Sequence, residues 1–308
     1  MPHLQKAVAI SDRSSIGEAR RAASGVARSL GYGEDRCSDI SIVATELATN
    51  ILLHGGSGEL LVCPVEAGPL VAGAAWLDLL ALDTGPGIRD VSRAFEDGVS
   101  TAGSAGQGLG AVNRLSDTVS LFSVVDGGTA VSCHFSAPSG REAEPVGVVS
   151  IPLHGETECG DSYFVLPGAR HSLFMLVDGL GHGPLAAHAA TAAVKVVEGS
   201  SQENLSEIMR RTHNALKATR GAVMAIARVD HEHSVATYVG VGNISASIGN
   251  GVVTRNMVSR DGTMGAVFPK LQEYTYPFEP GMKLLMFSDG LTSKCNFGGY
   301  PGIVNRPP

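Results

Sequence analysis

Two glycine clusters frame a short polar segment between Asp83 and Gly110, and this stretch limits the possible folds more than any other. The clusters read Asp83-Thr84-Gly85-Pro86-Gly87-Ile88 and Gly106-Gln107-Gly108-Leu109-Gly110. An apolar run over 77–82 leads into the first cluster. Glycines permit turns and close backbone approaches that residues with a Cβ atom resist. Because residues 97–105 are too small and polar to bury a core, we expect a mobile loop over a phosphate-bearing ligand.

The chain is long enough for two domains. It has 308 residues, and domains of about 150 residues are the usual solution when a chain outgrows one hydrophobic core. Residues 138–145 combine proline, glycine and charged side chains, a composition typical of a linker. We therefore expect one domain over 1–137 and a second over 146–308.

Charge and cysteine content exclude several classes of protein. The net charge is −7, and the acidic excess lies in the first 140 residues, which carry 9 positive and 15 negative side chains. Neither half has the basic stripe that nucleic-acid binding requires. The five cysteines form no Cys-x-x-Cys pair, which disfavours a disulfide framework or a zinc site. With no leader and no apolar window of about 18 residues, we expect a cytoplasmic protein without a membrane partner.

Hydrophobic periodicity in the first half predicts helices packed on a sheet. In the strongest predicted helix, apolar residues recur at helical spacing at positions 40, 43, 47 and 51. The turn Asp126-Gly127-Gly128 is a hairpin signal. We expect helices on one face of a mixed sheet, with helices over 16–31, 35–54, 91–95 and 109–115 and strands over 59–65, 74–82, 118–125 and 129–135.

The second half is richer in short strands, and two consecutive helices interrupt them. This pattern predicts a β-sandwich flanked by helices, so the whole chain falls in the α+β class. The predicted helices cover 184–198 and 203–217. The strand candidates are 146–153, 161–166, 172–177, 221–229, 234–242, 244–248, 252–258, 273–278 and 282–288.

Glu46, Asn50 and Asp83 suit an ATP site. Glu46 and Asn50 are four residues apart on a predicted helix, so they share one face. Asp83 at a strand end can accept a hydrogen bond from the adenine amino group, where guanine would present another acceptor. The amide oxygen of Asn50 suits a hydrated Mg²⁺ ion, and Glu46 can act as a base toward an attacking hydroxyl. Backbone N–H groups of the second glycine cluster, which opens a helix, can bind phosphates.

Simpler interpretations compete with the ATP site. The spacing Gly106-x-Gly108-x-x-Ala111 also fits a loose dinucleotide-binding fingerprint, although no strand precedes it and no βαβ unit surrounds it. Glu46 and Asn50 alone would more often form a solvated helix face, and Asp83 with its glycine would more often form a turn. Their occurrence together favours the nucleotide site.

These motifs, together with the Gly128-Thr129 pair, resemble the boxes of the GHKL ATPases. The resemblance is more specific in two segments, residues 45–50 (Thr-Glu-Leu-Ala-Thr-Asn) and 97–101 (Asp-Gly-Val-Ser-Thr). Over roughly 8–136, the chain resembles the serine/threonine switch kinases of the bacterial stressosome and their anti-sigma relatives. The resemblance implies a GHKL α/β sandwich, ATP and Mg²⁺ as cofactors, and Glu46 as the catalytic base. It assigns to the nucleotide Asn50, Asp83, Gly85, Gly87, Gly106, Gly108, Gly110 and Thr129.

Three acids of the second half, Asp161, Asp178 and Asp289, stand at predicted strand ends. Carboxylates gathered at one sheet edge suit hard divalent ions, and Gly179 after Asp178 leaves a carbonyl accessible to such an ion. Two ions can share a hydroxide placed for in-line attack on a phosphate. Because Asp-Gly is also the commonest hairpin turn, isolated examples would mean nothing more.

The surroundings of these acids, Gly160-Asp-Ser-Tyr163 and Asp178-Gly-Leu-Gly-His-Gly183, resemble the type 2C-like protein phosphatases of the stressosome feedback and sporulation-stage-II-E group, over 146–302. The resemblance implies Mn²⁺ or Mg²⁺ held by Asp161, Asp178, Asp289 and the carbonyl of Gly179. Members of the family continue to a final Asp-Asp or Asp-Asn motif, whereas no Asp or Glu follows Asp289. We therefore expect the final metal-binding segment to be missing and one metal ion to be weakly held.

The two resemblances together imply a bacterial partner-switching protein with opposed activities. The first half would phosphorylate Ser or Thr on an anti-sigma-factor antagonist domain of the stressosome type, and the second half would remove such phosphates. An alternative is an ATP-binding module that sequesters a sigma factor or another downstream regulator. A third interpretation makes the second half a catalytically impaired scaffold.

Overall fold

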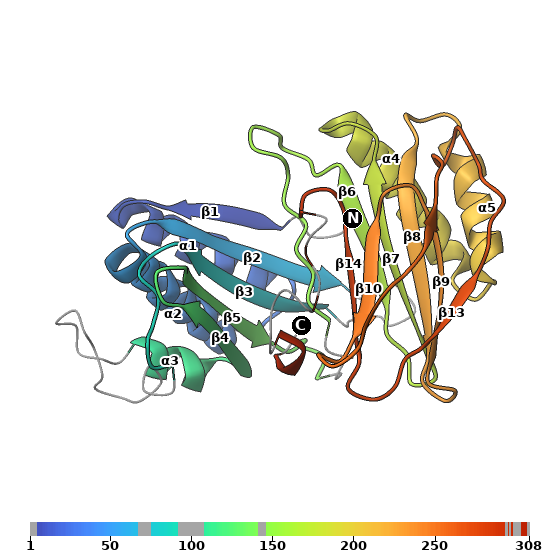
Figure 1. Cartoon of the computed structure of the whole chain (residues 1–308). Helices are drawn as coiled ribbons and strands as arrows, with labels where there is room; N and C mark the ends of the chain where they lie inside the picture. The colour runs from blue at the N-terminus through green and yellow to red at the C-terminus, as the bar shows by residue number, and fades with distance from the viewer. Residues whose placement is uncertain are drawn as a thin grey trace. The chain divides into compact units, whose positions relative to one another are not determined.

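The structure, a computed structural model, describes residues 5–66, 75–91, 108–140, 146–292, 295, 297 and 303–306. The described residues form two compact units, one up to Ile151 and the other from Pro152 onward (Figure 1). Within these ranges no helix is both long enough and apolar enough to span a bilayer. All five cysteines are free thiols.

The first unit contains a five-stranded sheet in the order β1-β2-β3-β5-β4. Each pairing is antiparallel, which corrects the expectation of a mixed sheet. The pairs β2–β3 and β4–β5 join consecutive strands, and the connections through the helices bring β1 beside β2 and β5 beside β3 in antiparallel directions as well. The sequence analysis also missed β1, a five-residue strand in which only alternate residues are buried. The strands are β1 (Lys6–Ile10), β2 (Gly58–Glu66), β3 (Ala75–Asp83), β4 (Thr118–Val124) and β5 (Gly128–Phe135).

Helices cover one face of this sheet, as expected (Figure 1). They are α1 (Arg13–Ser29), α2 (Glu34–Asn50) and α3 (Gly108–Leu115). The four apolar positions that predicted the second helix are all buried in one core with alternate residues of β3. That helix does not continue regularly to its predicted end, because the chain changes at Ile51–Gly55 into a π-helical turn, η1. The helix expected over 91–95 lies outside the described residues beyond Val91.

The second unit is built from two sheets and two helices. One sheet has the order β12-β9-β8-β7-β6, with β13 paired to β9, and the other has the order β11-β10-β14. The helices are α4 (Pro184–Ser200) and α5 (Leu205–Leu216). The strands are β6 (Asp161–Leu166), β7 (His171–Gly179), β8 (Ala222–Asp230), β9 (Val235–Val241), β10 (Ser245–Gly249), β11 (Thr254–Asn256), β12 (Ser259–Arg260), β13 (Tyr274–Pro277) and β14 (Lys283–Phe287).

Two apolar layers organise the second unit. One face of the larger sheet packs against α4 and α5, and the opposite face packs against the three-stranded sheet. The predicted α+β fold, with a sandwich flanked by helices, is therefore confirmed. The strand predicted over 146–153 is wrong: the carbonyl of Val148 and the N–H of Ser150 bind the side chain of Gln5 instead of a neighbouring strand.

Gly128 provides a test of how closely the hairpin of β4 and β5 packs on β3. Its φ is +94°, and a Cβ atom there would lie 2.1 Å from the carbonyl oxygen of Asp83. We predict that Gly128→Ala lowers the free energy of unfolding of the first unit by about 3 kcal/mol, because a left-handed conformation and a backbone clash add. Urea unfolding followed by the fluorescence of Trp76, the single tryptophan, reports on this unit.

Gly31→Ala is the matched control. Gly31 has a similar φ of +84°, but no atom lies within 4 Å of the Cβ position. Only the conformational penalty of about 1 kcal/mol applies there. Equal losses in the two variants would contradict the packing argument.

Candidate functional site

Glu46 and Asn50 meet the first residue of α3. A Cβ atom on Gly108 would lie 2.9 Å from Oε2 of Glu46 and 3.6 Å from Oδ1 of Asn50. The absence of a Cβ atom at Gly108 lets the start of α3 approach the ends of the two side chains closely. The first N–H groups of a helix have no partner within it and attract negative charge. A carboxylate, an amide and a helix N-terminus are thus brought together, as an ATP site requires.

Asp83 ends β3 on the face of the sheet that the helices cover. It pairs with Gly58 of β2 and with Thr129 of β5, and directly paired residues present their side chains on the same face. Its Oδ1 accepts a hydrogen bond of 2.9 Å from the N–H of Gly85. Both Asp83 and Thr129 are half-buried, so each is partly accessible to a ligand.

Glycines bring the backbone close to the Asp83 carboxylate. A Cβ atom on Gly55, the last residue of η1, would lie 2.5 Å from Cβ of Asp83, and one on Gly85 would lie 2.7 Å from Cα of Gly55. Gly87 has a φ of +69° and packs on the carbonyl of Val124. The predicted roles of Gly85 and Gly87 as close-approach residues fit this packing. Gly110 is buried in α3, and Gly106 lies outside the described residues.

Two features of this site were missed from the sequence. Ser123 Oγ accepts a hydrogen bond from the N–H of Ile88 at 2.8 Å and lies 3.0 Å from both the carbonyl of Gly128 and Oγ1 of Thr129. It thereby ties the turn after Asp83 to the neighbouring hairpin. The other feature is η1, and π-helical turns are frequent at functional sites. The alternation of β4 could have placed Ser123 on this face, whereas no sequence signal marks η1.

The carboxylates of the second unit gather at the end of β6 and β7. Asp161 and Asp178 lie opposite each other in the strand register, and Asp289 follows β14. Burial, then the charges of Asp161 and Asp289, raise the pKa of Asp178 to about 7. Burial, together with the charge of Asp289, also raises the pKa of Asp161. The raised pKa values of the two paired carboxyl groups favour retention of a proton by this pair.

Neighbouring groups hold this cluster in place. Ser288 donates a hydrogen bond of 2.5 Å to Oδ2 of Asp161. A Cβ atom on Gly179 would lie 2.2 Å from the carbonyl oxygen of Ala186, so the first turn of α4 packs directly on that glycine. In the loop before α4, Nδ1 of His182 lies 2.6 Å from Oε1 of Glu156. Sequence reasoning missed Ser288, although it directly precedes Asp289.

The donor types fit a hard divalent ion. Carboxylate and backbone oxygens are the ligands that Mg²⁺ and Mn²⁺ prefer, and two carboxyl groups that share a proton become two anionic ligands once that proton leaves. Among the residues that the structure describes, no three His, Cys, Asp or Glu side chains are already arranged around one metal position. Because burial raises the pKa of both paired acids, we expect metal and proton to compete at this site.

Asp178 gives the metal-free protein a measurable pH dependence. Its folded-state pKa of about 7 exceeds the value of about 3.9 in an unfolded chain. The resulting stabilisation is complete below about pH 4 and is lost as the pH rises through about 7. We predict that the melting temperature of the second unit in EDTA falls between pH 5 and 8, as measured by calorimetry.

Asp178→Asn isolates this effect because the amide does not titrate. The difference in melting temperature between the parent and this variant should change with pH, which removes contributions common to both proteins. Saturating Mn²⁺ should reverse the trend in the parent, since metal binding needs deprotonated carboxylates. A difference that stays constant from pH 5 to 8 would show that Asp178 does not carry the proton.

Comparisons with known proteins match each half separately. Residues 10–135 match the model of the histidine kinase-like ATPase domain, and residues 168–299 match that of stage II sporulation protein E (SpoIIE). A solved structure from the bacterial stressosome, described as a modular system adapted to control secondary messenger signalling, is 31% identical. It covers 49% of this chain and 79% of its own, with a TM-score of 0.47.

Two proteins of Bacillus subtilis (strain 168) are similar to the two halves. The phosphoserine phosphatase RsbX is 28% identical over 145 residues, which make up 47% of this chain and 73% of RsbX. The serine/threonine-protein kinase RsbT is 39% identical over 127 residues, which make up 41% of this chain and 92% of RsbT. The chain therefore belongs to the RsbT family of serine/threonine kinases through its first half, and its second half is similar to SpoIIE and to RsbX.

Proposed function

We propose that the first unit transfers phosphate from Mg-ATP to Ser or Thr of a partner protein and that the second unit hydrolyses the resulting phosphoester. The observation that carries the kinase role is the contact of Glu46 and Asn50 with the N-terminus of α3. The similarity of the two halves to RsbT, a kinase, and RsbX, a phosphatase, agrees with this division. We propose 1–137 and 146–308 as the functional domains, with residues 146–151 packing on the first unit.

In the kinase reaction each residue has a separate role. Asp83 accepts a hydrogen bond from the adenine amino group, and Thr129 lies beside it. The N–H groups of the first turn of α3 bind the phosphates. Asn50 would hold Mg²⁺, which neutralises charge on the phosphates. Glu46 takes the proton of the substrate hydroxyl. The hydroxyl oxygen of the substrate bonds to the γ-phosphorus while the bond from that phosphorus to the oxygen of the leaving ADP breaks.

In the phosphatase reaction, the acids of the second unit would hold the metal ions, and neighbouring residues orient those acids. Asp161, Asp178, Asp289 and the carbonyl of Gly179 would hold Mn²⁺ or Mg²⁺, which supplies an activated water and binds phosphate oxygens. Ser288 fixes the orientation of the Asp161 carboxylate. The packing of Gly179 on α4 fixes the backbone that carries its carbonyl.

The proposed partner is an anti-sigma-factor antagonist domain of the stressosome type. The family of switch kinases that the first unit resembles acts on such domains, and a stressosome structure is among the similar proteins. We propose a cytoplasmic location for the exchange. The acidic net charge of −7 agrees with a protein partner rather than a nucleic acid.

Label transfer from radioactive ATP to an antagonist domain tests the kinase role. We predict that Glu46→Gln lowers the rate by a factor of about 10² to 10⁴, the usual contribution of a general base. Glu59→Gln, at an exposed carboxylate on β2, should leave the rate unchanged. Transfer that survives Glu46→Gln would exclude Glu46 as the base, and ATP binding without any transfer would favour a sequestration module.

Release of phosphate from a phosphoserine partner in the presence of Mn²⁺ tests the phosphatase role. We predict that Asp178→Asn reduces turnover by at least about 10²-fold, because one anionic ligand is lost. Glu279→Gln, at an exposed acid before β14, is the control and should retain full turnover. A parent protein that shows no turnover at any Mn²⁺ concentration would mean that this unit is a scaffold.

A further inference from the structure

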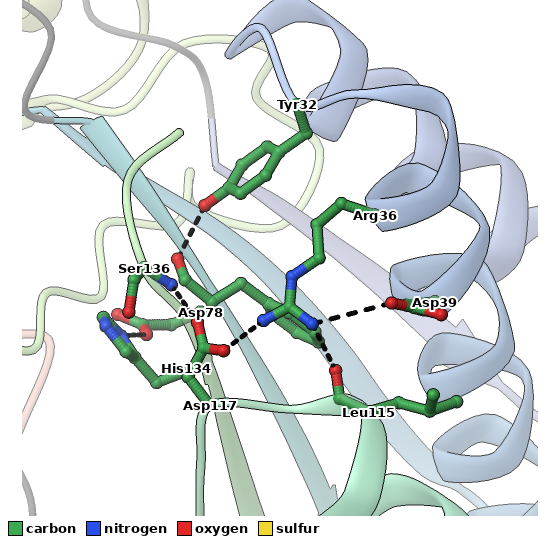
Figure 2. A network of polar contacts seen from close by, with 9 residues as sticks. Tyr32, Arg36, Asp39, Asp78, Leu115, Asp117, His134 and Ser136 are labelled. Carbon is green, nitrogen blue, oxygen red and sulfur yellow. Dashed lines mark hydrogen bonds and ion pairs between the residues drawn. The ribbon is translucent and has the colours of Figure 1, made fainter. Parts of the chain in front are cut away.

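Helix α2 contacts both ends of α3, and the two helices run in opposite directions. The start of α3, Gly108, lies against Glu46 and Asn50. Its last residue, Leu115, is bound by Arg36 near the start of α2 (Figure 2). Arg36 and Glu46 are ten positions apart, about 15 Å along a helix, while the eight residues of α3 span about 12 Å. One helix therefore sets the position of the other along its whole length.

The Arg36 guanidinium makes several contacts at the far end of α3. Its Nη1 donates to the carbonyl oxygen of Leu115 at 2.8 Å, and its Nη2 lies 2.5 Å from Oδ1 of Asp117. Its Cζ lies 5.0 Å from the centre of the Phe135 ring. The carbonyl at a helix C-terminus has no partner within the helix. Arg36 therefore satisfies the end of α3 and joins it to the residue that begins the approach to β4.

Asp117 is itself fixed to the sheet. Its Oδ2 accepts a hydrogen bond of 2.7 Å from the N–H of Ser136, and its N–H donates to the carbonyl of His134 at 3.0 Å. Burial opposes the charge of Asp117, but the hydrogen bonds from Ser136 and Arg36 lower its pKa overall. A charged carboxylate thus holds the guanidinium between the sheet and α3 (Figure 2).

We propose that Arg36 is a positioning residue for nucleotide binding: by anchoring the C-terminal end of α3 it keeps Gly108 against Glu46 and Asn50. An eight-residue helix is not stable alone. Val112 packs the middle of α3 into the core, and Arg36 fixes its C-terminal end through Leu115 and Asp117. Arg36 does not touch the reacting groups and acts only through α3. The inference rests on the proposed nucleotide site.

Arg36→Lys in the full chain tests the proposal. Lysine keeps the charge, but a single ammonium group does not reproduce the planar fork that binds Leu115 and Asp117 together. Isothermal titration should show Mg-ATP binding weakened about tenfold, within the usual range of coupling between separate positions. Amide hydrogen exchange over 109–115 should be faster without nucleotide, while exchange in α1 stays the same. Arg28→Lys, whose 3.9 Å ion pair with Glu34 is exposed, should match the parent.

A second variant guards against general unfolding. Asp117→Asn keeps the side-chain shape and one acceptor, so it should show the same pattern with a smaller loss of affinity. Unchanged affinity and unchanged exchange in Arg36→Lys would overturn the positioning role while leaving the proposed function intact. A parent protein that does not bind Mg-ATP would instead overturn the nucleotide site, and this inference with it.

Discussion

The arrangement of the first unit depends on the packing of α2 on the sheet and against α3. The buried stripe of this helix fixes its rotation on the sheet, and that rotation decides where its polar residues point. Glu46 and Asn50 therefore face the start of α3, and Arg36 faces its end. Because one rigid helix carries all three, a shift that disturbed the core would also displace the nucleotide site. The packing of α2 in the core therefore also fixes the geometry of the proposed site.

In the second unit, the main constraint is the repulsion between carboxylates that lie close together. Asp161 and Asp178 lie opposite each other at the end of a hairpin, with a serine as hydrogen-bond donor to one of them. Without a counter-ion the pair retains a proton near neutral pH, since burial and mutual repulsion disfavour two charges. The proton stabilises the fold and must leave before a metal binds. As the pH rises, we therefore expect a divalent metal ion to replace the proton at this pair of acids.

Much of the secondary structure and of the buried face of α2 could be predicted from the pattern of residue types in the sequence. The apolar stripe of α2 predicted its buried face, the turn at Asp126 predicted the β4–β5 hairpin, and the four-residue spacing placed Glu46 and Asn50 on one helix face. Local spacing does not reveal contacts that depend on tertiary geometry. Arg36 is 79 positions from Leu115, and Ser123 is 35 positions from Ile88, so nothing nearby in the chain marks either pair. The same holds for the 146–153 segment, whose strand-like composition was outweighed by hydrogen bonds to Gln5.

Fusion of the two units changes what controls the proposed switch. Separate kinase and phosphatase chains set the phosphorylated fraction of a partner through their relative abundance, whereas a single chain fixes their ratio at one to one. The balance then depends on conditions that act differently on the two sites. Under the proposed function, nucleotide occupancy would act at the start of α3, whereas divalent metal and pH would act at the paired acids, where burial raises the pKa of Asp178 to about 7. Under the proposed function, the chain would therefore respond to its chemical surroundings rather than to its own concentration.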